Sequence, residues 1–186
     1  HLSGQICTSA ERIFVVDGIH DEFVAKLSAS AKTLRVGDGF GKHEIGPLAT
    51  EAARDKAARM VDAAITAGAK AECGGRIPPD HSTGWYYEPT VLSGVTPDMA
   101  IMQDEIFGPI LPIVSIPDGA DLNAVLRLLQ GLDKPLAIYC FSKSKSLWQA
   151  IKVRSRSGGL VINDCLIHFT VKTLPFGGIG GSGTGA

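Results

Sequence analysis

The sequence predicts an α/β fold, a three-layer αβα sandwich in which helices cover both faces of a mostly parallel sheet. Segments of strand type and of helix type alternate along the chain, and several strand segments are apolar throughout, as strands buried on both faces are. The 186 residues are 45% hydrophobic, which is enough for one domain with a core of its own. In such a sheet we expect the chemistry on loops beyond the strand ends.

The amino-terminal part predicts one strand and two helices. Arg12–Val16 is an apolar strand. A helix that begins at residue 18 ends at Gly37, and a second helix over residues 51–67 has Thr50 as its N-cap and Gly68 as its C-cap. The positions expected on the inner faces are Phe23, Leu27, Ala31 and Leu34 in the first helix and Ala53, Ala57, Met60, Ala64 and Ala67 in the second.

The remaining chain continues the alternation. Strands or extended segments are predicted over residues 69–75, 86–95, 110–116, 135–141 and 160–163. Asp118 is expected to cap a helix that buries Leu122, Val125, Leu126 and Leu129. A last helix, over residues 143–157, is expected to end at Gly158 and Gly159.

The charge pattern excludes several classes of partner. Eighteen Lys and Arg residues face nineteen Asp and Glu residues, for a net charge of -1, and no long basic block is present. Nothing therefore indicates binding to nucleic acid or to an anionic membrane surface. No apolar run is long enough to span a bilayer, so no membrane segment is expected in this chain.

The four cysteines indicate reduced thiols and a cytoplasmic location. Cys7, Cys73, Cys140 and Cys165 are widely spaced, without the His or Cys neighbours of a zinc site, so no metal is expected. Cys140 and Cys165 lie in apolar runs and are expected to be inert core residues, and Cys73 is expected to be structural.

Cys7 differs because it lies in a polar stretch, "SGQICTSAERIFV" (Ser3–Val15), directly before a strand. A nucleophilic cysteine needs partial exposure and nearby donors for an oxyanion, and backbone N–H groups beside Cys7 could supply them. By itself the pattern more often marks a small buried cysteine before a strand.

Two further stretches, one with acidic residues and one rich in glycine, are candidates for a functional site. In "QDEIFGPILPI" (Gln103–Ile113), Glu105 could accept hydrogen bonds from ribose hydroxyls and Phe107 could press on a planar ring, or both could belong to an ordinary strand entry. In "LPFGGIGGSGTGA" (Leu174–Ala186), no helix follows the glycines, which argues against a dinucleotide fingerprint. A loop closing over a pocket, with Phe176 as an apolar wall, and a floppy tail are the two interpretations.

The order of these stretches resembles the NAD(P)-dependent aldehyde dehydrogenase superfamily. "GQICTSAERIFV", then "EIFGP" about a hundred residues on, then "PFGG" near the end carry the resemblance, supported by segments 36–50, 84–92 and 135–142. The stretches "MQDEIFGPILPI" and "GGLVINDCLIHF" are similar to the class 3, or fatty-aldehyde, branch.

The resemblance implies a function and its residues. Cys7 would be the catalytic nucleophile, passing through a thiohemiacetal and a thioester as an aldehyde is oxidised to a carboxylic acid. Glu105 would bind the nicotinamide-ribose hydroxyls of NAD or NADP, with Phe107 at the same end of the cofactor. Apolar side chains of Ile167, Phe169 and Phe176 would suit medium-chain, aromatic or fatty aldehydes, although they could equally be core residues.

The resemblance also implies that parts of the enzyme lie outside this chain. Residues 1–186 would form the catalytic domain, with 164–186 as a glycine-rich active-site loop region. The cofactor-binding fold, the general-base glutamate, the oxyanion asparagine and the oligomerisation strand of a homodimer or homotetramer would be absent, and the isolated chain would be inactive. The alternatives are a CoA-acylating relative and a non-catalytic isolated domain.

Overall fold

The structure is a computed structural model that describes residues 2–81, 83–118 and 122–184. The chain forms two compact units, His1–Asp118 and Gly119–Ala186, and each is described by itself. Whether residues 1–186 act as a single catalytic domain stays a prediction.

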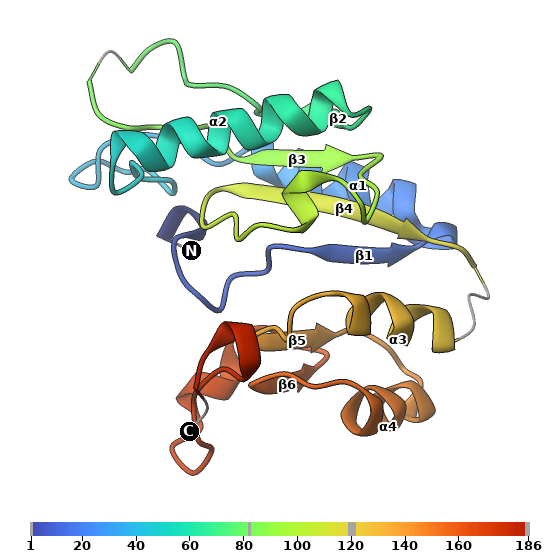
Figure 1. Ribbon diagram of the computed structural model, residues 1–186. Coiled ribbons are helices and arrows are strands. Elements are labelled where there is room, and N and C mark those ends of the chain that lie inside the picture. Colours follow the sequence, from blue (N-terminus) through green and yellow to red (C-terminus); the bar gives the residue numbers. More distant parts are fainter. Residues whose placement is uncertain (1, 82, 119–121, 185–186) are drawn as a thin grey trace. The chain divides into compact units, whose positions relative to one another are not determined.

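The first unit is built on a four-stranded sheet with the order β1-β4-β3-β2 (Figure 1). Its strands are β1 (Ile13–Val16), β2 (Lys70–Cys73), β3 (Thr90–Ser93) and β4 (Ile110–Ile116). β4 is parallel to both β1 and β3, and β2 is antiparallel to β3. The register places Ile13 opposite Ile113 and Thr90 opposite Ile110, so the chain enters β1, β3 and β4 from the same edge of the sheet.

Helices α1 (Asp17–Lys32) and α2 (Glu51–Thr66) cover the two faces of this sheet. Because side chains alternate along a strand, β4 sends Ile113 toward Val24 of α1 and Val114 toward the α2 side, where Val61 is fully buried. The three-layer α/β architecture predicted from the sequence is therefore confirmed.

Both helices begin where the sequence predicts, but some details differ. Thr50 is the N-cap of α2, accepting a hydrogen bond from the Ala53 N–H at 3.1 Å. Val61, rather than Ala67, completes the buried face of α2, and Ala67 is exposed. α1 ends at Lys32 instead of continuing to Gly37, which leaves Leu34 outside the helix and partly exposed.

In the part of the second unit that the structure describes, two parallel strands alternate with two α-helices. They are α3 (Leu122–Gly131), β5 (Ala137–Cys140), α4 (Lys145–Arg154) and β6 (Gly159–Ile162). Leu126, Cys140 and Ile151 form its buried centre. α4 ends three residues before its predicted end because Ser155 already has an extended backbone.

Short 3₁₀ helices also occur among the described residues: η1 (Leu2–Gly4), η2 (Ala100–Met102), η3 (Ile167–Thr170) and η4 (Gly180–Ser182). The described part of the glycine-rich segment folds back on itself, with the Ile179 N–H donating to Ser182 Oγ at 3.0 Å. The end of the predicted loop region, residues 185–186, lies outside the described residues. Among the described helices, none combines the length and the apolar character needed to cross a bilayer.

Candidate active site

Cys7 occupies a tight turn on the surface of the first unit. The Ser9 N–H donates to the Ile6 carbonyl at 2.9 Å, which closes a turn with Cys7 and Thr8 at its centre. The Cys7 side chain is exposed. The hydrogen bond that closes the turn joins Ile6 and Ser9, so the Cys7 N–H takes no part in it.

The turn is anchored to the loop that precedes α2. The Ser3 hydroxyl donates to the Gly46 carbonyl at 3.0 Å, and the Gln5 side-chain oxygen accepts from the Ala49 N–H at 2.8 Å. Gln5 also donates to the Pro47 carbonyl at 3.4 Å. The polar residues around Cys7 therefore fix the turn from outside and leave the thiol at the surface.

Glu105 and Phe107 lie on the loop that leads into β4. The Glu105 side chain is exposed, and its backbone carbonyl accepts from Lys56 Nζ at 2.5 Å. Phe107 is 41% exposed and has a left-handed backbone with φ of 49°. An exposed carboxylate and an exposed ring two residues apart could hold the hydroxyls and the flat ring of a ligand.

The structure brings the Cys7 segment and this loop together. Arg12 donates to the carbonyls of Met102 at 2.8 Å and Asp104 at 3.2 Å, and Glu11 accepts from the Phe107 N–H at 2.7 Å. Cys7, Glu105 and Phe107 therefore belong to two loops that are tied together before the amino ends of β1 and β4. The sequence did not indicate that Glu11 and Arg12 make these hydrogen bonds between the two loops.

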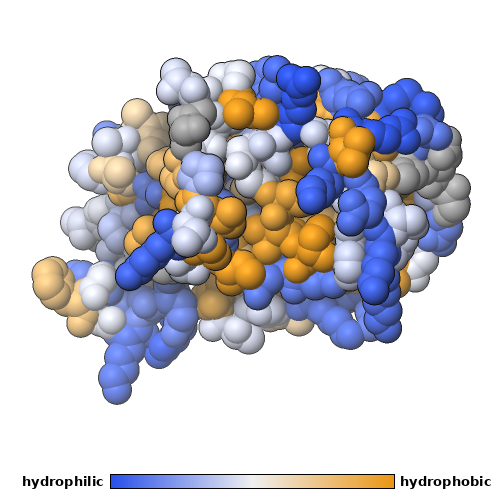
Figure 2. Space-filling view, turned by 90° about the horizontal axis from the view of Figure 1, so that it is seen from below, coloured by the Kyte–Doolittle hydropathy of each residue, from blue (hydrophilic) through white to orange (hydrophobic). Residues whose placement is uncertain are grey.

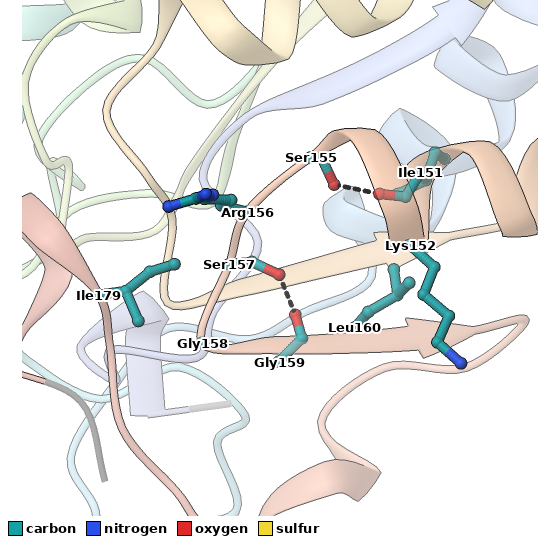
Figure 3. A pocket seen from close by; sticks show the side chains of 9 residues that line it. All are labelled: Ile151, Lys152, Ser155, Arg156, Ser157, Gly158, Gly159, Leu160 and Ile179. Atoms are coloured by element: carbon teal, nitrogen blue, oxygen red, sulfur yellow. Dashed lines mark hydrogen bonds between the residues drawn. The ribbon is translucent and has the colours of Figure 1, made fainter.

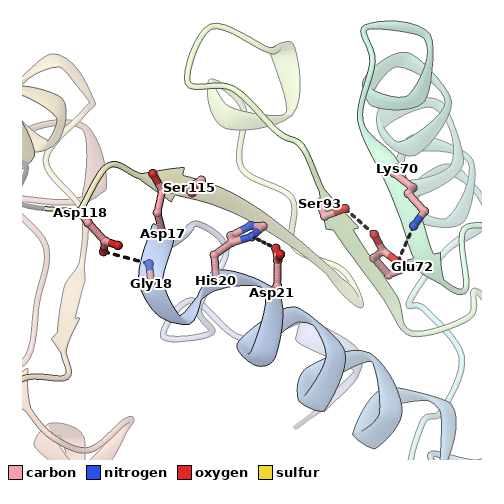
Figure 4. A network of polar contacts seen from close by, with 9 residues as sticks. All are labelled: Asp17, Gly18, His20, Asp21, Lys70, Glu72, Ser93, Ser115 and Asp118. Atoms are coloured by element: carbon pink, nitrogen blue, oxygen red, sulfur yellow. Dashed lines mark hydrogen bonds and ion pairs between the residues drawn. The ribbon is translucent and has the colours of Figure 1, made fainter.

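The opposite edge of the sheet carries a separate set of polar contacts (Figure 4). There the Gly18 N–H donates a hydrogen bond to Asp118 Oδ1 at 2.9 Å. The hydroxyl of Ser115 donates to the Asp17 carboxylate, and that of Ser93 donates to the Glu72 carboxylate at 2.6 Å. Parallel sheets commonly bind ligands at this carboxyl edge. In this chain the predicted site residues of the first unit, Cys7, Glu105 and Phe107, lie instead at the edge where the parallel strands begin.

Ile167, Phe169 and Phe176 belong to the second unit. Their exposed fractions are 47%, 52% and 48%, so they are surface side chains and not core residues of that unit. Two of them lie beside His168, whose ring centroid is 5.8 Å from that of Phe176 and 6.3 Å from that of Phe169. The Kyte–Doolittle colouring of Figure 2 shows that hydrophobic residues also reach the surface among hydrophilic ones on the face drawn there.

The remaining cysteines have different environments. Cys73 and Cys140 are buried, as predicted, and burial raises the pKa of the Cys140 thiol. The prediction that Cys165 is a core residue is wrong, because β6 ends at Ile162 and Cys165 follows in an exposed bend. Partial desolvation, and then the neighbouring charge of Asp164, raise the pKa of the Cys165 thiol.

A surface pocket of about 280 Å³ lies beside the end of α4 (Figure 3). The hydroxyls of Ser155 and Ser157, which line this pocket, donate to nearby backbone groups. Ser155 donates to the Ile151 carbonyl, and Ser157 donates to the Gly159 carbonyl. Lys152 and Arg156 extend to opposite sides of the opening in Figure 3 and do not converge on one ligand position. No group of three or more potential metal ligands gathers among the residues that the structure describes.

Comparison with known proteins identifies the family. The sequence profile of the aldehyde dehydrogenase family matches residues 1–186. Dimeric NADP-preferring aldehyde dehydrogenase from Mus musculus is 33% identical over 99% of this chain and 38% of its own length. Betaine aldehyde dehydrogenase from Bacillus subtilis is 36% identical over 98% of this chain and 37% of its own length.

Solved structures agree with the sequence relatives. A double mutant of betaine aldehyde dehydrogenase from Staphylococcus aureus, in complex with NAD+ and with a BME-modified cysteine, superposes with a TM-score of 0.88 at 30% identity. The match covers 98% of this chain and 36% of that one. This chain thus spans little more than a third of the length of these relatives. The predicted similarity to the class 3 branch is not singled out, because two differently named enzymes are 33% and 36% identical to the chain.

Proposed function

The chain belongs to the aldehyde dehydrogenase family, and we propose that it is the catalytic part of an enzyme that oxidises an aldehyde to a carboxylic acid with NAD or NADP. The observation that supports the proposal is the exposed Cys7 thiol, on a turn tied to the loop of Glu105 and Phe107. In this proposal Cys7 is the nucleophile, and the other two residues hold the nicotinamide end of the cofactor.

The chemistry assigned to Cys7 has three steps. Its sulfur bonds to the aldehyde carbon, and the carbonyl oxygen takes up a proton to give a thiohemiacetal. Loss of a hydride and a proton converts this adduct into a thioester. Water then adds to the thioester carbon, the carbon–sulfur bond breaks, and the acid leaves with the thiol restored. The Cys7 N–H would stabilise the oxyanion that develops in the first and last steps.

NAD or NADP would accept the hydride when bound. The residues present fit this role, since the exposed Glu105 carboxylate can accept two hydrogen bonds from neighbouring ribose hydroxyls. The partly exposed Phe107 ring offers a flat apolar contact next to it. Both side chains come from a loop whose backbone is fixed by Lys56 and Arg12.

The substrate and the cellular setting complete the proposal. The exposed apolar side chains of Ile167, Phe169 and Phe176 would contact a medium-chain, aromatic or fatty aldehyde. All four cysteines are free thiols, which suits the reducing cytoplasm. A homodimer or homotetramer is proposed for the complete enzyme; the Mus musculus relative is named dimeric.

The test measures NADH and NADPH formation by the complete polypeptide that contains this chain, with octanal and benzaldehyde as substrates. We expect aldehyde-dependent formation of the reduced cofactor, abolished by Cys7→Ser and retained by Cys165→Ser, the matched exposed cysteine. A Cys7→Ser variant that is folded and still active would refute the role of Cys7. Acylation of added CoA in place of release of the acid would assign the chain to a CoA-acylating enzyme.

A further inference from the structure

Glu11 connects the Cys7 segment to the Glu105–Phe107 loop by a direct hydrogen bond. Its carboxylate oxygen Oε1 accepts from the backbone N–H of Phe107 at 2.7 Å, across 96 positions of sequence. A hydrogen bond to a charged acceptor is stronger than one between neutral groups. Glu11 lies four residues after Cys7, on the segment that continues into β1.

The donor of this bond, Phe107, has an uncommon backbone conformation. Phe107 has a φ of 49°, a left-handed value that is costly for a bulky residue and persists only where its surroundings impose it. This conformation sets the direction of the Phe107 ring relative to the preceding residues of the loop, which include Glu105. A carboxylate that holds the Phe107 N–H therefore helps to fix the ring relative to Glu105.

Three further side-chain contacts on this loop involve backbone carbonyl groups. Arg12 donates to the carbonyls of Met102 and Asp104, and Lys56 donates to the carbonyl of Glu105. These contacts fix the first part of the loop. Glu11 acts at Phe107 itself and is an acceptor, so Arg12 and Lys56, which can only donate, cannot replace it.

We propose that Glu11 is a positioning residue for the hydride-transfer step. Through the Phe107 N–H it holds Phe107 left-handed, and in this way it aligns the Glu105 and Phe107 side chains with the cofactor relative to Cys7. The inference rests on the proposed function, because it assumes that this loop holds the nicotinamide end of NAD or NADP. Misplacement of reacting groups by about 1 Å can cost on the order of 10²-fold in rate.

The experiment compares Glu11→Ala, Glu11→Gln and wild type in the complete polypeptide that contains this chain. Single-turnover hydride transfer is measured with octanal at saturating cofactor, together with the aldehyde KM. For Glu11→Ala we expect roughly a 10- to 100-fold slower hydride transfer with little change in KM. Glu11→Gln keeps a side-chain oxygen that can accept from Phe107, and it should recover most of the rate.

Glu22→Ala is the matched control, because Glu22 is an exposed glutamate that pairs with Lys26 on α1. It should leave the rate unchanged. Hydrogen exchange of the segment 103–108, followed in the same variants, reports the loop directly and needs no activity. It should accelerate in Glu11→Ala and stay near wild type in Glu11→Gln.

The outcomes separate this inference from the proposed function. If wild type forms no reduced cofactor, the proposed function fails, while the hydrogen-exchange comparison still tests the contact. An active wild type with a Glu11→Ala variant equal to it in rate would overturn the positioning role. So would a Glu11→Gln variant as slow as Glu11→Ala, since the hydrogen-bond acceptor would then not be what matters.

Discussion

The α-carbon of Gly4 packs directly against the backbone carbonyl of Gly108. A β-carbon at residue 4 would lie 2.1 Å from the Gly108 oxygen, and the Gly4 backbone is left-handed with φ of +74°. The two glycines belong to the loops that carry Cys7 and Glu105. Glycine at position 4 is therefore required by the close approach of these loops as well as by its own backbone conformation.

Gly4→Ala should destabilise the chain by more than about 1 kcal/mol, because the methyl group collides with backbone and the left-handed conformation becomes strained. Urea unfolding followed by circular dichroism measures the change. Gly39→Ala is the control, since a β-carbon there meets nothing within 4 Å. Equal unfolding midpoints for the two variants would contradict the packing described here.

Cys7 should react with iodoacetamide faster than the other three cysteines. Cys73 and Cys140 are buried, and the raised pKa of the exposed Cys165 leaves less of it as thiolate at neutral pH. Mass mapping of partially alkylated protein gives the four rates. Cys165 labelling ahead of Cys7 would contradict the prediction.

Asp164→Asn tests the cause assigned to the Cys165 pKa. Removing the neighbouring negative charge should lower this pKa, and alkylation of Cys165 near pH 8 should become faster. The Cys7 rate serves as the internal reference and should stay constant. A Cys165 rate that does not change would show that desolvation alone raises the pKa.

The Arg35–Glu44 pair should make stability depend on pH in the acid range. Hydrogen bonds from Arg35 lower the pKa of Glu44 from 4.5 to about 2. A depressed folded-state pKa stabilises the chain above the unfolded-state value near 4.3, and this contribution is lost as the pH falls toward 2. Both side chains are exposed, so the effect should be small and should weaken with salt.

The measurement compares urea midpoints of wild type and Glu44→Gln between pH 6 and pH 2. The advantage of wild type should be present at pH 6 and should shrink below about pH 4.5. Arg35→Met removes the other partner and should abolish the same advantage. A difference that stays constant down to pH 2 would mean that the pair is not formed in solution.

Thr50→Ala should cost about 1 kcal/mol of stability, because it removes the side-chain acceptor for the Ala53 N–H at the start of α2. Thr50→Ser keeps a hydroxyl and should be close to neutral. Thermal unfolding of the two variants measures the difference. A Thr50→Ser variant as unstable as Thr50→Ala would point to the lost methyl group instead of the cap.

Most of the fold could be predicted because local patterns determine it. β4 has the predicted bounds Ile110–Ile116, since a largely apolar run between Gly108-Pro109 and Pro117 has few alternatives. The ends of α1 and α4 could not be predicted as well. The sequence predicts that glycines stop them, but α1 already ends at Lys32, with Thr33 as its C-cap, and α4 ends at Arg154, before the extended backbone of Ser155.

In the candidate site, too, local sequence patterns predict some features and not others. The local patterns place Cys7, Glu105 and Phe107 before strands but leave open whether Cys7 and Phe107 are buried; the structure exposes all three side chains. The contact between Glu11 and Phe107 joins residues 96 positions apart, and no local pattern indicates it. Cys165 was misplaced because its apolar neighbours suggested a strand that in fact ends at Ile162.

Glu105→Gln should slow hydride transfer more than it weakens aldehyde binding. The carboxylate can accept hydrogen bonds on both oxygens, whereas the amide has a single acceptor and would place a donor toward one ribose hydroxyl. The nicotinamide would then be held less well, and misplacement of about 1 Å can cost on the order of 10²-fold in rate. The aldehyde contacts Cys7 and apolar side chains in this proposal, so its affinity should change little.

Single-turnover formation of the reduced cofactor and the aldehyde KM, both in the complete polypeptide that contains this chain, separate the two effects. Asp104→Asn is the matched control, because Asp104 is an exposed neighbouring acid whose backbone carbonyl, not its carboxylate, is bonded by Arg12. It should leave both quantities near wild type. If Glu105→Gln leaves hydride transfer unchanged while aldehyde affinity collapses, Glu105 belongs to the substrate site and its assignment to the cofactor is wrong.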